Sequence, residues 1–162
     1  MTDIKVVPQS SMDADTVAGV AQFLGPVVVD LTALGVDGKQ AHWHVRGPNF
    51  QAVHELLDTI VDHAHEYADT AAERVVALGL PLDVRIQTVG AKATTPVFEA
   101  GFQQSDAVIA QVIAAIDATL VTVRTAVTEL AELDPVSQDV VIEIARGLDK
   151  DRWFLSAHLS TK

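Results

Sequence analysis

Two pairs of potential metal ligands lie within the segment 54–73. His54 and Asp58 are four residues apart, and Asp69 and Glu73 repeat that spacing. Residues four apart on a helix share a face, so each pair presents two ligand side chains together. Imidazole and carboxylate groups bind divalent metal ions, and each pair therefore amounts to half of a metal site.

The two pairs are placed symmetrically about a point between His63 and Ala64. Asp58 and Asp69 are separated by about 16 Å on one straight helix, so the pairs cannot close around a single ion. If two copies of the helix pack antiparallel across a two-fold axis, the first pair of one copy faces the second pair of the other, twice. The spacing predicts a homodimer with two shared sites.

Other histidines flank these pairs. His42 precedes the helix and is expected to supply a further nitrogen, and two imidazoles with three carboxylates suit iron or manganese. His63 and His65 occupy different helix faces, and polar surface or interface roles are favoured over binding of extra metal. His44 and His158 have no partner at ligand spacing. The competing interpretation is that such acidic pairs are ordinary solvent-exposed residues of a helix surface. Two symmetric pairs together with His42 favour the metal site over that interpretation.

Composition restricts the chemistry further. The chain has no Cys, which excludes disulfides, thiolate catalysis and iron–sulfur centres. A net charge of -11 disfavours nucleic acid as a partner. The first residues lack the features of a secretory signal, and the longest stretch without charge, Thr16 to Val29, is too short for a bilayer. We expect a cytoplasmic protein with no membrane contact.

Helix-breaking residues divide the chain into four long helical segments. The expected helices run from near Asp13 to about Val45 with a kink at Pro26, from Pro48 in the first turn to before Gly79, from about Phe102 to Leu133, and from Asp134 as cap and Pro135 to about Leu159. A short helix is expected within 84–93, in the long connection.

These elements predict an all-α protein: an antiparallel four-helix bundle in one domain, residues 13–162, preceded by a flexible tail, residues 1–12. The segment 107–127 is apolar on more than one face, which a lone bundle would leave partly exposed. That surplus of apolar surface predicts an oligomer.

Five segments together resemble the Dps family of mini-ferritins, the "DNA-binding proteins from starved cells". They are KQAHWHVRGPNF, AVHELLD, YADTAAERVVALG, DPVSQDVV and GLDKDRWFL. The resemblance covers nearly the whole chain except the first dozen residues. It implies a ferritin-like bundle and a twelve-subunit hollow shell. It further implies that the shell oxidises Fe(II), preferably with hydrogen peroxide, stores ferric oxide and protects against oxidative stress.

The resemblance also implies roles for individual residues. Trp43 matches the tryptophan beside the ferroxidase centre, where it intercepts radicals, and the alternative is a packing anchor. Lys39 and Arg46 resemble scaffold positions. The implied iron ligands are His42, His54 and Asp58 from one subunit and Asp69 and Glu73 from its two-fold mate.

Acidic residues near the start of the last helix resemble the lining of the three-fold pores that admit Fe(II). They are Asp134, Asp139 and Glu143, for which a helix cap and solvated charges are the alternative. DNA-binding members carry several basic residues in a terminal tail, whereas here the first segment has only Lys5 and the C-terminus only Lys162. DNA binding is therefore expected to be weak or absent.

Two other functions compete with iron oxidation. A metal-dependent hydrolase could use the same His and carboxylate ligands, because a bound divalent ion lowers the pKa of its water, but no substrate pocket is evident in the sequence. A DNA-compacting structural assembly is the second alternative, and the acidic charge opposes it.

Overall fold

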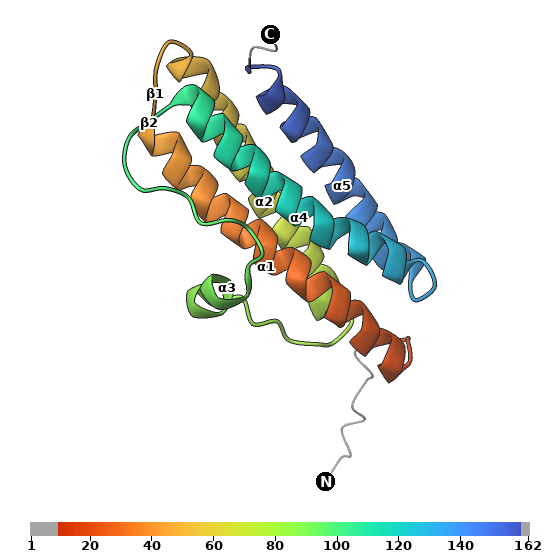
Figure 1. Cartoon of the computed structure of the whole chain (residues 1–162). Coiled ribbons are helices and arrows are strands. Elements are labelled where there is room, and N and C mark those ends of the chain that lie inside the picture. Colours follow the sequence, from red (N-terminus) through yellow and green to blue (C-terminus); the bar gives the residue numbers. More distant parts are fainter. Residues whose placement is uncertain (1–9, 160–162) are drawn as a thin grey trace.

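The chain folds as a bundle of four long helices with one short additional helix. The computed structural model describes residues 10–159. Its elements are α1 (Ala14–His44), β1 (Val45–Arg46), α2 (Phe50–Ala77), α3 (Ile86–Lys92), β2 (Gln103–Gln104), α4 (Ser105–Leu130) and α5 (Pro135–Ser156). Helix α3 lies beside α1, in the connection from α2 to α4 (Figure 1). The predicted all-α bundle with a short helix in this connection is confirmed.

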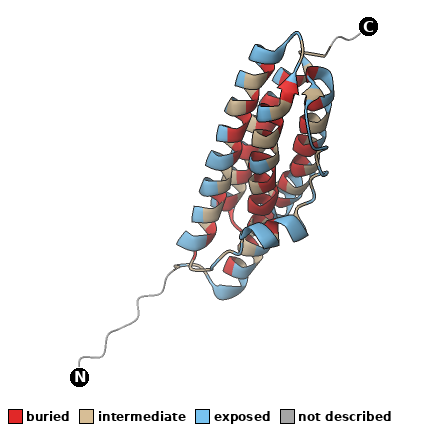
Figure 2. Ribbon diagram, turned by 90° about the vertical axis from the view of Figure 1, so that its left-hand side faces the viewer, coloured by how far each residue is buried: buried red, intermediate tan, exposed pale blue. Residues whose placement is uncertain are grey.

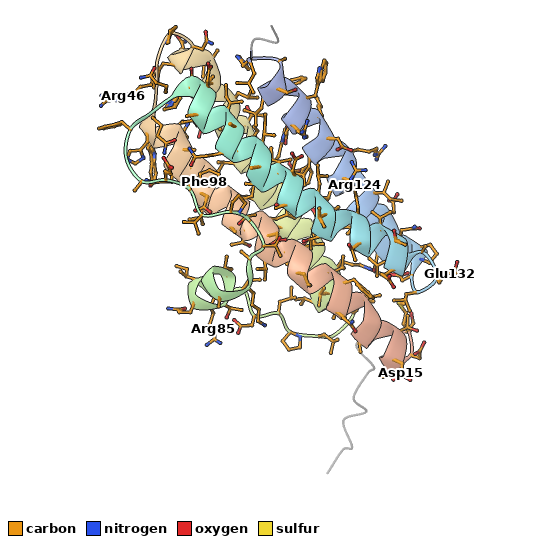
Figure 3. The ribbon with its side chains drawn as sticks, viewed as in Figure 1. Asp15, Arg46, Arg85, Phe98, Arg124 and Glu132 are labelled. Carbon is orange, nitrogen blue, oxygen red and sulfur yellow. The ribbon has the colours of Figure 1, made fainter. Side chains whose placement is uncertain are left out.

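The connection between α2 and α4 returns along the length of the bundle, so that α2 and α4 run in the same direction (Figure 1). It ends where β1 and β2 pair in parallel, with Arg46 opposite Gln104. The guanidinium of Arg46 lies 3.4 Å from the centre of the Phe102 ring. Figure 3 shows Arg46 at this end and Glu132 at the opposite end of the bundle. The pairing therefore holds the end of the connection against the end of α1.

Local capping explains where the helices begin. The carboxylate of Asp13 accepts a hydrogen bond from the Thr16 amide at 2.9 Å and caps α1. Asp134 caps α5 with Pro135 in the first turn, as predicted. Helix α1 continues without interruption through Pro26.

Four of the predicted boundaries were wrong by two or three residues, namely the starts of α2 and α4 and the ends of α4 and α5. Helix α2 begins after Pro48, because Gly47 has a φ of 120° and Asn49 occupies the cap position. A side chain at Gly47 would also approach Gln104 Oε1 to 2.9 Å. Helix α4 ends before Leu133 because Asp134 must be extended, with a ψ of 103°, in order to cap α5. The corrected boundaries are Phe50 for α2, Ser105 and Leu130 for α4, and Ser156 for α5.

The core lies between the four long helices and is almost entirely aliphatic. Figure 2 shows buried residues along the inner faces and exposed residues outside. Helices α1 and α4 are long and apolar enough to cross a membrane by length and composition alone, but both pack as core helices of the bundle.

Several large apolar side chains stay exposed in the single chain, among them Val36, Ile86, Val97 and Val121. This surface is available for contacts between subunits.

Candidate metal centre

Two imidazoles meet where α1 ends and α2 begins. His42, in the last turn of α1, is buried, and His54, in the first turns of α2, is half-buried. Their rings are stacked, with centroids 3.6 Å apart and planes inclined by 21°. The chain reverses direction at residues 45–49, and this brings the two histidines together at one end of the bundle.

Each imidazole is oriented by the backbone of the other residue. His42 Nδ1 lies 2.8 Å from the His54 carbonyl oxygen, and His54 Nδ1 lies 2.9 Å from the His42 carbonyl oxygen. A carbonyl oxygen only accepts hydrogen bonds, so both Nδ1 atoms donate and the neutral rings keep a lone pair on Nε2. Hydrogen bonds of this kind set the tautomer of metal-binding histidines. Both residues are thus prepared to bind a metal through Nε2.

Asp58 lies one turn beyond His54 and is paired with Lys39 of α1. The hydrogen bond from the Lys39 ammonium lowers the pKa of Asp58 below its usual range, and His42, whose Nδ1 is 3.4 Å from Asp58 Oδ1, adds to this effect. The carboxylate is therefore ionised near neutral pH, the form in which it binds metal ions. His42, His54 and Asp58 are therefore the candidate ligands of one half-site.

Lys39 is a neighbour of the candidate ligand Asp58 that the sequence interpretation did not place there, since the resemblance assigned it only a scaffold position. The available signal was its spacing, because Lys39 precedes His42 by about one helical turn and so shares its face. In the isolated subunit the Lys39 ammonium is paired with Asp58 Oδ1, so it competes with a metal ion for that oxygen.

The remaining predicted ligands do not reach this half-site within one subunit. Asp69 and Glu73 are exposed on α2, about 16 Å and about 22 Å along the helix from Asp58. Across residues 10–159, no three His, Asp or Glu side chains converge closely enough to hold a metal ion. The single chain therefore presents two incomplete halves on α2, and their joining by a second subunit stays a prediction.

Trp43 lies beside the half-site but outside the core. Its neighbour His42 is buried, whereas the Trp43 side chain is largely exposed. The indole is therefore no anchor within the subunit. Contact with another subunit and a redox role beside the metal both stay predictions.

The three residues predicted to line a pore differ in their surroundings. Asp134 is buried and accepts hydrogen bonds from the Ser137 amide at 3.0 Å and from Arg74 Nη2 at 2.6 Å. Its carboxylate thus caps α5 and ties it to α2. Asp139 and Glu143 are exposed on α5. The capping role of Asp134 is thus confirmed, and the pore role of the three residues stays a prediction.

Replacing Lys39 with Met is expected to strengthen divalent-metal binding about fivefold, because a competing cation is removed from Asp58 while the aliphatic stem is kept. The measurement is an anaerobic titration with Co(II), followed by its visible absorption. Lys39→Arg, which keeps the positive charge, should bind like the original protein. Weaker binding by Lys39→Met would mean that Lys39 positions Asp58 for the metal.

Comparison with known proteins shows similarity along most of the chain. A family model described as a ferritin-like domain matches residues 27–162, a range that includes all five candidate metal ligands. The "DNA protection during starvation protein" of Agrobacterium fabrum is 34% identical over 148 residues, which cover 91% of this chain and 90% of the relative.

Two solved structures illustrate how closely the fold agrees. One is Dps from Microbacterium arborescens in the high iron form, with 57% identity, a TM-score of 0.89, and coverage of 92% of this chain and 97% of that chain. The other is Dps from Mycobacterium smegmatis in a tetragonal form, with 29% identity, a TM-score of 0.88, and coverage of 99% and 96%.

Proposed function

Because the chain belongs to the Dps family of ferritin-like proteins, we propose that it is a ferroxidase and iron-storage protein that oxidises Fe(II), preferably with hydrogen peroxide, at sites shared between subunits. The observation that carries the proposal is the reciprocal bonding of His42 and His54 beside an ionised Asp58. Two Nε2 atoms and a carboxylate, joined by two further carboxylates, suit Fe(II) better than a softer metal.

In this proposal Fe(II) is the substrate of the site. His42, His54 and Asp58 bind it from one subunit, and Asp69 and Glu73 of the mate complete the ligand set. Hydrogen peroxide takes one electron from each of two Fe(II) ions and two protons, and becomes two water molecules. Carboxylate oxygens favour the Fe(III) product. Because no one-electron reduction of peroxide occurs, no hydroxyl radical is released, and iron storage and protection against oxidative stress are one activity.

The oligomer that this function needs is a set of two-fold dimers assembled into a dodecameric shell with ferric oxide inside. Exposed apolar side chains on α1 and in the region of α3 support subunit contacts, among them Val36, Ile86 and Val97. Asp134, Asp139 and Glu143 are proposed to line the pores for Fe(II) entry. A cytoplasmic location is expected, because Fe(II) and reducing conditions coincide there.

DNA binding is proposed to be weak or absent, although the names of relatives refer to DNA protection. The net charge of -11 repels phosphate backbones at physiological salt. Lys5 and Lys162, the basic residues nearest the two ends, lie outside the described residues. Retardation of DNA in a gel by the intact assembly at physiological salt would contradict this proposal.

The direct test adds Fe(II) anaerobically to the purified metal-free protein and then adds peroxide. Ferric absorbance and particle size are followed together. Rapid oxidation that yields a soluble, iron-filled particle supports both the ferroxidase and the storage roles. Oxidation no faster than in buffer alone, or precipitation of ferric oxide outside the protein, would refute the proposal.

A further inference from the structure

The side of α2 that faces α5 makes specific contacts with it at three positions along the helix axis. Residues 63, 67 and 74 of α2 meet residues 151, 147 and 134–137 of α5, in antiparallel order. The spacings of four and seven place the three α2 residues on one stripe. At 100° per residue, the three residues of this stripe lie about 140° to 180° around the helix from Asp58. It is therefore separate from the stripe that carries the candidate ligands.

The first contact joins His63 to a buried carboxylate. Asp151 is 2% exposed, and both of its oxygens lie 3.0 Å from His63 Nδ1. Among the described residues, no other side chain donates a hydrogen bond to Asp151. A buried carboxylate is costly without a partner, so His63 must keep its N–H directed at Asp151. Burial raises the pKa of Asp151, and the hydrogen bond from His63 opposes that change.

The second contact, one turn along α2, is steric. A Cβ atom on Gly147 would lie 1.9 Å from the Tyr67 hydroxyl oxygen and 2.6 Å from Cζ of the same ring. The phenol ring thus rests directly on the backbone of α5, and only glycine permits this approach. A slip of α2 along α5 by one turn would place a side chain under the ring. Tyr67 therefore sets the axial position of α2 against α5.

The place of His63 along α2 gives these contacts a functional meaning. His63 lies five residues after Asp58 and six before Asp69, so it is next to the centre of the symmetric ligand pattern. A rotation of α2 by about 10° moves side-chain atoms near the helix surface by about 1 Å. Metal–ligand distances tolerate about 0.2 Å. A contact at the centre of α2 that resists rotation acts equally on both half-sites.

We propose that His63 and Asp151 are a positioning pair, which fixes the rotation of α2 about its axis and thereby sets the geometry of both half-sites on that helix. This inference depends on the proposed shared metal site. It gives His63 a role through its Nδ1–H donor, and not through Nε2 as a metal ligand.

The test compares two substitutions that separate the two nitrogen atoms. The Asn amide in His63→Asn places an N–H donor where Nδ1 was, and it removes Nε2. His63→Leu removes both. Anaerobic Co(II) titration of the assembled protein, followed by visible absorption, is expected to show about tenfold weaker binding and an altered spectrum for His63→Leu. His63→Asn should remain within about twofold of the original protein.

Controls make each outcome decisive. His158→Leu, the same change of side chain beyond the end of α5, should bind Co(II) normally. If His63→Leu fails to assemble, His63→Gln replaces it. The longer Gln side chain does not place its N–H at the Nδ1 position, so this variant should bind Co(II) weakly. Normal binding by His63→Leu or His63→Gln would overturn the proposal, and so would equal losses in His63→Asn and His63→Leu. Absence of Co(II) binding in the original protein would instead refute the proposed metal site.

Discussion

Replacing Asp58 with Ala is expected to slow peroxide-dependent oxidation of Fe(II) about a hundredfold and to leave the assembly intact. Asp58 supplies the anionic oxygen of the half-site that contains His42 and His54. Its side chain is 46% exposed and its partner Lys39 is 36% exposed, so the substitution leaves no buried charge unpaired. Ferric absorbance in stopped flow gives the rate, and size-exclusion chromatography reports assembly.

A matched substitution and a mixing experiment sharpen this test. Asp15→Ala changes an exposed carboxylate at the far end of α1 and should oxidise iron normally (Figure 3). Assemblies built only of Asp58→Ala subunits or only of Glu73→Ala subunits should each oxidise Fe(II) about a hundredfold more slowly. When the two are unfolded, mixed and reassembled, each mixed dimer contains one intact site, and random pairing restores about a quarter of all sites. A mixture that stays equally slow would show that no site is shared between subunits.

Replacing Asp134 with Ala is expected to lower the free energy of unfolding by about 3 kcal/mol at pH 7. The carboxylate is 6% exposed, caps the amides of Val136 and Ser137, and pairs with Arg74. The substitution removes the cap and leaves the half-buried guanidinium without its partner. Urea denaturation at fixed protein concentration measures the change, because oligomer stability depends on concentration.

The effect of Asp134→Ala should depend on pH. Burial raises the pKa of Asp134, but the hydrogen bonds from Ser137 and Arg74 outweigh it, so the pKa lies below the usual 3.8. A carboxyl group whose pKa is lowered by folding stabilises the protein above its unfolded pKa, and this stability is lost as the pH falls through the folded pKa. The difference in the free energy of unfolding between the original protein and Asp134→Ala should therefore decrease as the pH falls below about 4.

Asn at position 134 separates the two contributions of this residue. Asn caps helices about as well as Asp but carries no charge. Asp134→Asn should therefore keep most of the cap and lose the ion pair with Arg74, so that its loss of stability is smaller than that of Asp134→Ala. A loss for Asp134→Ala that is identical at neutral and acid pH would contradict the assignment of this ion pair.

The sequence by itself was sufficient for the order and type of the helices and for placing the two candidate ligand pairs on α2. These features are local, since the Asp134-Pro135 start signal involves adjacent residues, and the ligand pairs follow from a spacing of four. The symmetry about His63 also pointed to a dimer without any structure. Boundaries were less accurate, because Gly47 and the pairing of β2 delay the starts of α2 and α4.

The tertiary structure alone decided which polar groups meet. His42 and His54 orient each other across 12 positions of the chain, Lys39 reaches Asp58 across 19, and His63 reaches Asp151 across 88. A chain with 22 acidic residues offers many partners for each cation, and only the packing of helices selects among them. Burial then makes the chosen contacts specific, because a carboxylate removed from water requires its donor.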